Sequence, residues 1–170
     1  SASERLRTIR NFQDLHQGNL TQNTLRFYPR NPSQSKLRSN YKKNPLPRNH
    51  KKRILAIGLF LTPSIVTDNP PAFVNSLNHA GLVFKRAEGD RTKLREHVGK
   101  FLHLAPQPTE GAIHVPTRPL VRLADPDELV IEPDESFDLE IQFDDPSGLP
   151  ATDAGYELGA FIQIAHMPVN

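Results

Sequence analysis

The last third of the chain has the clearest alternation of hydrophobic and polar positions. In the stretch SFDLEIQFD, residues 136–144, every second residue from position 137 onward is apolar. The apolar set is Phe137, Leu139, Ile141 and Phe143. A period of two is typical of a half-buried antiparallel strand. We therefore expect these four side chains in a core, with Asp138 and Glu140 in solvent or at an interface.

Other apolar stretches predict further short strands. ILAIGLFLT (54–62) and YELGAFIQIAHMPV (156–169) are the longest, and GLVFKRA, GAIHV, RPLVRLA and ELVIE are shorter. Residues 68–81 predict a short helix with prolines in its first turn and Gly81 after its end. Residues 90–105 fit a helix in their first half and a strand in their second. About eight short strands separated by Pro, Gly and Asp turns predict an all-β antiparallel sandwich with one or two short helices.

The N-terminal residues follow a different period. In residues 3–17, Ser3 can cap a helix, and Leu6, Ile9 and Phe12 recur at helical spacing. The pattern predicts a short amphipathic helix. Such a helix docks on its own domain or on a neighbour, or alternatively lies on a membrane surface.

Charge divides the chain more sharply than hydropathy does. Residues 1–53 hold thirteen Lys and Arg against two acids, whereas residues 123–170 hold twelve acids and neither Lys nor Arg. Four prolines and many Asn and Ser lie among the cations of residues 18–53, with few apolar residues. Because such a composition buries little surface, we predict an extended basic N-terminal arm over residues 1–53 and a folded domain over 54–170.

The arm supplies the candidate contact residues. Arg26 and Arg30 flank the aromatic pair Phe27 and Tyr28, a mixture that suits single-stranded nucleic acid, and the remaining cations can neutralise phosphates. The complete set is Arg26, Arg30, Lys36, Arg38, Lys42, Lys43, Arg48, Lys51, Lys52 and Arg53. The expected partners are acidic edges of neighbouring subunits, nucleic acid or anionic lipid.

The sequence contains no recognisable catalytic motif. The sequence has no cysteine, no phosphate-binding glycine loop and no HExxH motif. His97, His103 and His114, with Glu140, are the candidates for a cupin-like metal site, but the usual HxH pair is missing. The acidic turns around ELVIE could bind Ca²⁺, although turn formation explains them as well. We therefore expect no enzyme activity, no cofactor, no metal and no small-molecule substrate.

The segment LVIEPDESFDLEIQFDDPSGLPATDAGYELGAFIQIAHMPV (129–169) resembles the closing strands of jelly-roll virion proteins from small tailless icosahedral phages. The resemblance extends more loosely over residues 54–170. It implies a jelly-roll-like sandwich, and a structural role in the virion as a capsid or capsid-associated subunit that contacts itself and other virion proteins. An RNA-binding component of a ribonucleoprotein is the main alternative, and a cupin-like metal enzyme is a second.

Overall fold

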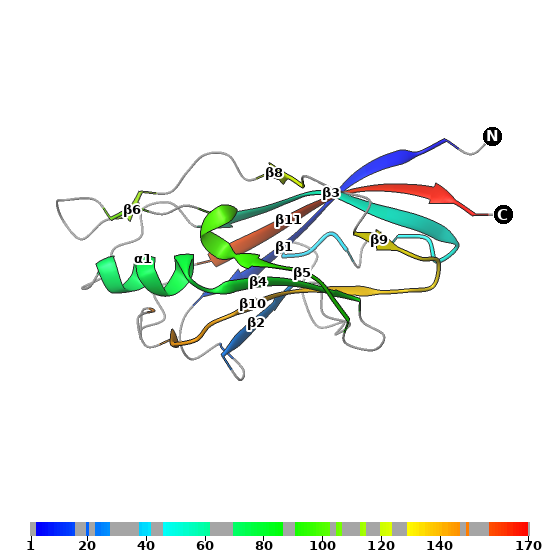
Figure 1. Cartoon of the computed structure of the whole chain (residues 1–170). Coiled ribbons are helices and arrows are strands. Elements are labelled where there is room, and N and C mark those ends of the chain that lie inside the picture. The colour runs from blue at the N-terminus through cyan, green and yellow to red at the C-terminus, as the bar shows by residue number, and fades with distance from the viewer. Residues whose placement is uncertain are drawn as a thin grey trace.

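The computed structural model describes most of the chain in segments. They are residues 3–15, 20, 23–27, 38–41, 46–61, 70–86, 91–102, 105–106, 113–114, 120–123, 129–146, 149 and 157–169. Within these segments the regular structure is mostly β-strand, and no helix there is long and apolar enough to cross a membrane. Figure 1 shows strands stacked in two layers, with both termini at one end and helix α1 at the other.

The first layer, sheet A, is antiparallel and has the strand order β1-β11-β3-β8, with β9 also paired to β3. Its strands are β1 (Arg5–Asp14), β3 (His50–Leu61), β8 (Val121–Arg122), β9 (Val130–Ile131) and β11 (Glu157–Pro168). Strand β11 pairs along most of its length with β1 on one side and with β3 on the other. Sheet A therefore joins the two ends of the chain.

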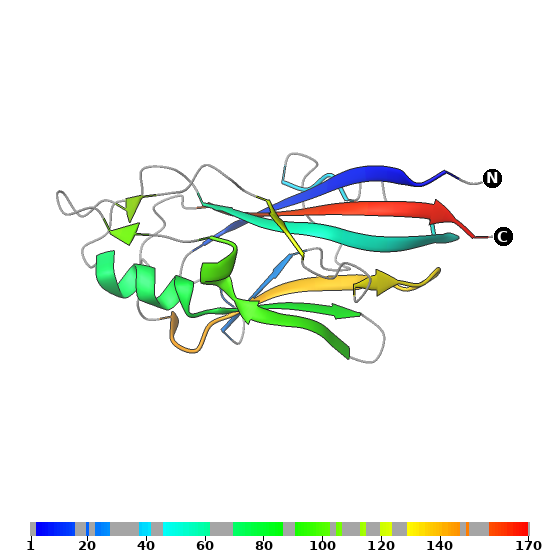
Figure 2. The ribbon, with the colours of Figure 1, turned by 45° about the horizontal axis from the view of Figure 1, so that its top comes forward.

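The second layer, sheet B, is also antiparallel and has the order β2-β10-β4-β5. Its strands are β2 (Thr24–Phe27), β4 (Gly81–Arg86), β5 (Arg91–His97) and β10 (Phe137–Gln142). Outside the two sheets lie α1 (Pro70–Asn78), a 3₁₀ turn (Val98–Lys100), and the small hairpin of β6 (Ala105–Pro106) and β7 (Ile113–His114). Figure 2 separates the two sheets and shows α1 at one end of sheet B.

The strand pairings are nested along the chain. The first strand pairs with the last, β2 pairs with β10, β3 pairs with β8 and β9, and β4 pairs with β5. The β6–β7 hairpin lies in the connection between β5 and β8. The described strands thus have the connectivity of one long hairpin whose pairs are divided between two sheets.

The core lies between the sheets, and the alternation of β10 predicted its part correctly. Phe137, Leu139, Ile141 and Phe143 are all buried. From sheet A, alternate residues of β11 and β3 face them, such as Ile162 and Ile57. The predicted strands at 54–62, 81–87 and 156–169 and the helix within 68–81 are likewise confirmed. The ambiguous residues 91–97 form strand β5.

The helix predicted over residues 3–17 is wrong. Residues 5–14 form β1, which pairs with ten consecutive residues of β11. Ile9 faces the core, while Leu6 is exposed and Phe12 lies on the opposite face. The helical spacing of these three residues was accidental, because pairing with β11 decides the conformation.

The extended arm is also wrong for the residues that the structure describes. Residues 24–27 form an edge strand of sheet B, and residues 50–53 begin β3 in sheet A. Ser39 forms an isolated bridge with Asn11, beside β1. The arm prediction failed because composition masked short alternating stretches such as Leu25 and Phe27, which are both buried. The predicted boundary at residue 53 falls inside one continuous strand.

Candidate functional site: charged residues and a polar hollow

The candidate cations do not form one surface. Arg26 lies on sheet B, Arg38 lies beside β1, and Arg48 lies in the turn before β3. The three successive cations Lys51, Lys52 and Arg53 lie at the start of β3, where alternate side chains point to opposite faces of sheet A. Arg30, Lys36, Lys42 and Lys43 fall outside the described residues.

Several of these cations pair with acids of the same chain. Arg38 contacts Asp14 at 3.0 Å and Glu157 at 3.2 Å, and Lys51 lies 3.9 Å from Glu132. These side chains are substantially exposed, so each pair contributes only about 0–1 kcal/mol. The pairing shows that part of the opposite charge of the two chain ends is balanced within one molecule.

Lys52 differs because its side chain is on the inner side of sheet A. It pairs in register with Ile131, a core residue, and is almost fully buried. Burial lowers the pKa of Lys52, and the nearby carboxylates of Asp134 and Glu135 partly offset that effect. Lys52 is therefore a structural cation in this chain and not an exposed contact for polyanion.

A buried carboxylate organises the outer face of sheet B, the side turned away from sheet A. Glu140 is only 4% exposed, although alternation places it opposite the core side of β10. Arg26 from β2 approaches it at 3.3 Å and Lys85 from β4 at 3.1 Å. The expectation that Glu140 lies in solvent is thus wrong, because cations on both neighbouring strands cover it.

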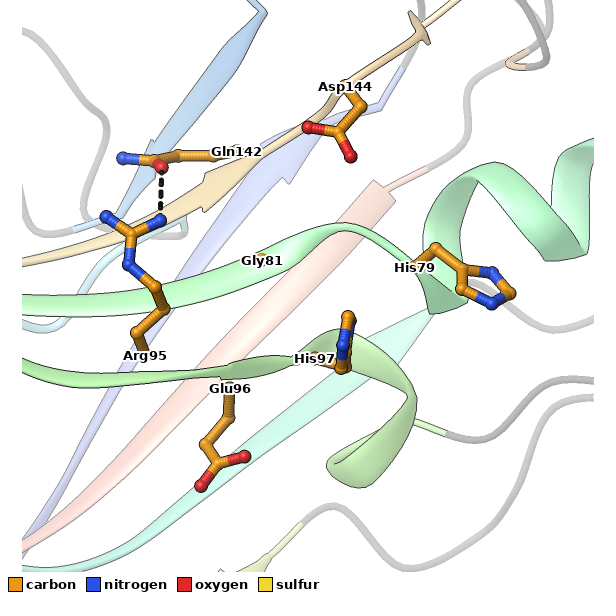
Figure 3. Close-up of a pocket in the computed structure, with 7 residues that line it drawn as sticks. All are labelled: His79, Gly81, Arg95, Glu96, His97, Gln142 and Asp144. Carbon is orange, nitrogen blue, oxygen red and sulfur yellow. Dashed lines mark hydrogen bonds between the residues drawn. The ribbon is translucent and has the colours of Figure 1, made fainter.

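Next to this network, a hollow of about 470 Å³ opens on sheet B. Gln142, Gly81 and His97 lie side by side on β10, β4 and β5, and the central residue has no side chain. His79, just after α1, completes the rim on one side, and Arg95 and Asp144 complete it on others (Figure 3). The side chain of Glu96 also belongs to the lining, but Figure 3 shows it directed away from Gln142 and Asp144.

Hydrogen bonds fix several groups around the hollow. Arg95 donates to Oε1 of Gln142 at 3.4 Å, and Nε2 of Gln142 donates to Glu140 at 3.2 Å. Nδ1 of His79 lies 2.9 Å from the carbonyl oxygen of Asn75, so Nδ1 must carry the proton. In the neutral ring, the other nitrogen of His79 is then an acceptor. The rings of His79 and His97 meet edge to face, with centroids 6.2 Å apart.

The metal set considered from the sequence does not come together among the described side chains. Glu140 is held by Arg26 and Lys85, whereas His97 lies at the hollow. The side chains of His103 and His114 fall outside the described residues. In the described part of the chain, no group of three or more His, Cys, Asp or Glu side chains could hold a metal ion.

Of the acidic turns around ELVIE, the described part has a structural role. Asp134 adopts a positive φ of 68°, a conformation that Asp tolerates in turns. The next residue, Glu135, forms a two-pronged ion pair with Arg86 of β4. This contact and the carboxylate charge raise the pKa of the Arg86 guanidinium. The turn thereby ties the start of β10 to the neighbouring strand β4.

A pair of histidines that the sequence did not predict lies at the end of sheet A where β1 and β3 begin and β11 ends, which we call the terminal end of sheet A. Nδ1 of His50 lies 2.8 Å from Nδ1 of His166, so one ring must donate and the other accept. His166 is buried on the core side and lies in register beside Lys52 and Arg5. Burial lowers the pKa of His166, and the positive charges of His50, Arg7, Arg5 and Lys52 lower it further.

Comparisons with known proteins leave this geometry as the main guide to function. No protein-family model matches the chain, and no significant match is found among curated proteins or solved structures.

Proposed function

We propose that this chain is a structural subunit of a virus particle that assembles through a jelly-roll sandwich. The nested strand pairing carries the proposal. Rolling an eight-stranded hairpin into two sheets puts the first strand beside the last in one sheet and the second beside the next-to-last in the other. Double-sheet jelly rolls of this kind recur in viral capsids, and also in lectins and cupins. Since fold alone does not fix function, the surface must supply further support.

Exposed apolar side chains at the terminal end of sheet A support self-association. Leu6 on β1 is 67% exposed, and Met167 and Val169, at the end of β11 and just beyond it, are also exposed. The register of β1 against β11 puts Leu6 opposite Ala165, two residues from Met167. Apolar side chains gathered at one end of a sheet are a feature of protein interfaces. We propose that this end contacts a neighbouring copy.

The purified protein tests this proposal directly. Sedimentation velocity and electron microscopy, each with and without nuclease, should show closed particles that survive nucleic-acid digestion. Leu6→Asp should shift these particles toward single subunits, while Thr8→Asp on the same face of β1 serves as the control for added charge. A chain that remains monomeric over the concentrations at which shells form would contradict the proposal.

The basic segment enters the proposal in a modified form. A truncated chain that begins at Ile54 lacks β1, β2 and the first part of β3. Its loss of both sheets would prevent it from testing the role of the basic residues. Substitution by glutamine of Lys42, Lys43 and Arg48 is a sharper test. If these cations meet neighbouring subunits, nucleic-acid-free particles should weaken, and salt near 1 M, where the Debye length is about 3 Å, should have the same effect. If the particles keep their stability and only nucleic-acid or lipid binding falls, the cations bind these polyanions and not neighbouring subunits.

The ribonucleoprotein alternative is favoured by one observation. On the outer face of sheet A, Arg10 of β1 pairs in register with Phe161 of β11. Arg122 of β8 lies beside Ala56, two strands from Phe161. Phe12 and Phe161 meet edge to face on the same side, with centroids 5.8 Å apart. Cations beside aromatic rings suit single-stranded nucleic acid. Under this alternative, nuclease treatment should reduce the purified protein to single subunits.

A further inference from the structure

We propose that the hollow on the outer face of sheet B binds a saccharide unit. The site is made by Gly81, Arg95, His97, Gln142 and Asp144, with His79 at its rim. The proposal goes beyond a role in the shell and does not rest on it, because the site lies within a single subunit.

Gly81 is the observation that points to a ligand. Its φ lies outside the left-handed region, so the backbone does not require glycine there. Among the described residues, a Cβ at this position would meet only the carbonyl oxygen of Gln142, at 4.0 Å, so packing against them does not require glycine either. Glycine inside a strand costs stability relative to other residues. What its absent side chain does provide is an open floor between Gln142 and His97.

The lining determines the class of ligand. Small-molecule sites are usually lined by apolar groups with a few polar ones, but the described side chains that line this hollow are all polar. Both donors and acceptors surround it: the guanidinium of Arg95 donates, the carboxylate of Asp144 accepts, and in its neutral form His79 offers an acceptor nitrogen because its Nδ1–H is bonded to Asn75. Hydroxyl groups of a sugar ring can satisfy both kinds of partner at once.

Charge argues against a polyanion at this place. Asp144 and Glu96 carry negative charge, and Arg95 carries one positive charge. Lys100 engages the carboxylate of Glu96 at 3.2 Å, which leaves Arg95 and Asp144 roughly balanced across the hollow. A neutral ligand rich in hydroxyl groups therefore fits better than a phosphate chain.

Saturation-transfer NMR on the full 170-residue chain provides the test. The probes are a neutral hexose, an N-acetylated amino hexose and a hexuronic acid, with Zn²⁺ and Ca²⁺ alone as separate probes. We expect at least one sugar to bind with a dissociation constant on the order of 1 mM, typical of a single small polar ring. Tighter binding of the same sugar at the end of an oligosaccharide would assign the site to a glycan chain. Equal affinity for the two forms would assign the site to the free sugar.

Two variants and a control locate the binding. Gly81→Val fills the floor, and it should keep or raise the thermal midpoint because valine favours strands, while raising the dissociation constant at least tenfold. Asp144→Asn, on an exposed loop position, should weaken binding several-fold without affecting the fold. Thr8→Val introduces the same side chain on an exposed position of sheet A and should leave binding unchanged.

Each other outcome overturns the proposal. No transfer to any of the sugars at about ten times the expected dissociation constant would exclude a saccharide site. Unchanged transfer in both Gly81→Val and Asp144→Asn would place any binding elsewhere on the chain. Perturbation of the His79 and His97 ring signals by Zn²⁺ or Ca²⁺, without a response to sugars, would make the hollow a cation site. If Gly81→Val does not fold, Gly81→Ala and Asp144→Asn decide the question.

Discussion

The two sheets share a core but use their outer faces differently. On the outer face of sheet A, rings shield small residues: a Cβ on Gly159 would lie 2.5 Å from an atom of the Phe12 ring, so the ring occupies that space. On the outer face of sheet B, the corresponding space beside Gly81 is open. Sheet A thus fills its glycine position with an aromatic ring, whereas sheet B surrounds its own with polar groups.

The charged residues differ in the same way. Sheet A pairs its outer cations with exposed acids, as in the contact of Arg53 with Glu4 at 2.9 Å. Sheet B instead buries one carboxylate, Glu140, between Arg26 and Lys85. Since a buried charge must be compensated while an exposed one is solvated, sheet B should depend far more on its charge network. The comparison also separates the two proposed surfaces, with association at sheet A and ligand binding at sheet B.

The largest expected effect concerns the core that the two faces have in common. Ile141→Ala in sheet B and Ile162→Ala in sheet A each remove a fully buried side chain and should each lower the free energy of unfolding by about 2–5 kcal/mol. Chemical denaturation should show one cooperative transition for both variants. Two separate transitions, or a loss confined to one sheet's spectroscopic signals, would break the picture of a single shared core.

How far the sequence predicted this core depends on which strand is considered. Strand β10 was predictable from the sequence, because Phe137, Leu139 and Ile141 alternate strictly with polar residues. Strand β1 did not, because Arg7 and Asn11 share the core side with Ile9 and disguise the alternation. Its strand conformation comes from pairing with β11, about 150 residues later, and local periodicity carries no information about such pairing.

The next effect tests the charge network of sheet B against the exposed pairs of sheet A. Glu140→Gln leaves Lys85 and Arg26 without their shared carboxylate, and it should lower the free energy of unfolding by about 1–3 kcal/mol. Glu4→Gln is the matched control and should cost less than about 1 kcal/mol. Urea denaturation measures both. Equal losses would show that burial of Glu140 does not distinguish the two faces.

A smaller effect is expected at the glycine that sheet A covers with an aromatic ring. Gly159→Ala forces the Phe12 ring to move, and we expect a loss of about 1–2 kcal/mol in the free energy of unfolding, since overpacking is costly but the ring is near the surface. The loss should shrink in a Phe12→Ala background, because the methyl group then has room. A loss that stays the same in both backgrounds would mean that the two residues do not compete for this space.

The candidate site could not have been predicted from the sequence, for a physical reason. Gly81, His97 and Gln142 become neighbours only because β4 lies between β5 and β10. No local spacing links these three residues. The histidine pair is similar: His50 and His166 are 116 positions apart and meet where β3 begins and β11 ends. The individual cations were visible in the sequence, but the face of the sheet on which each one lies was set by register.

The smallest effect that we predict is a pH dependence at the terminal end of sheet A. In the folded chain, burial and the positive charges of His50, Arg5, Arg7 and Lys52 hold the pKa of His166 below its ordinary value. Asp134 and Glu135 face Lys52 from the turn before β10, but they do not reverse this direction.

The unfolded chain therefore binds a proton at His166 at a higher pH than the folded chain does. Stability should be fully present above the unfolded pKa of about 6.5 and should fall as the pH drops from there through the lower folded pKa. Thermal unfolding between about pH 7.5 and 5 measures this. His166→Gln, which keeps a polar side chain that cannot titrate, should flatten the fall, whereas His79→Gln, at an exposed position just after α1, should not. A fall that is equally steep in the wild type and in His166→Gln would assign the acid sensitivity to other groups, and the terminal end of sheet A would then have no special role in it.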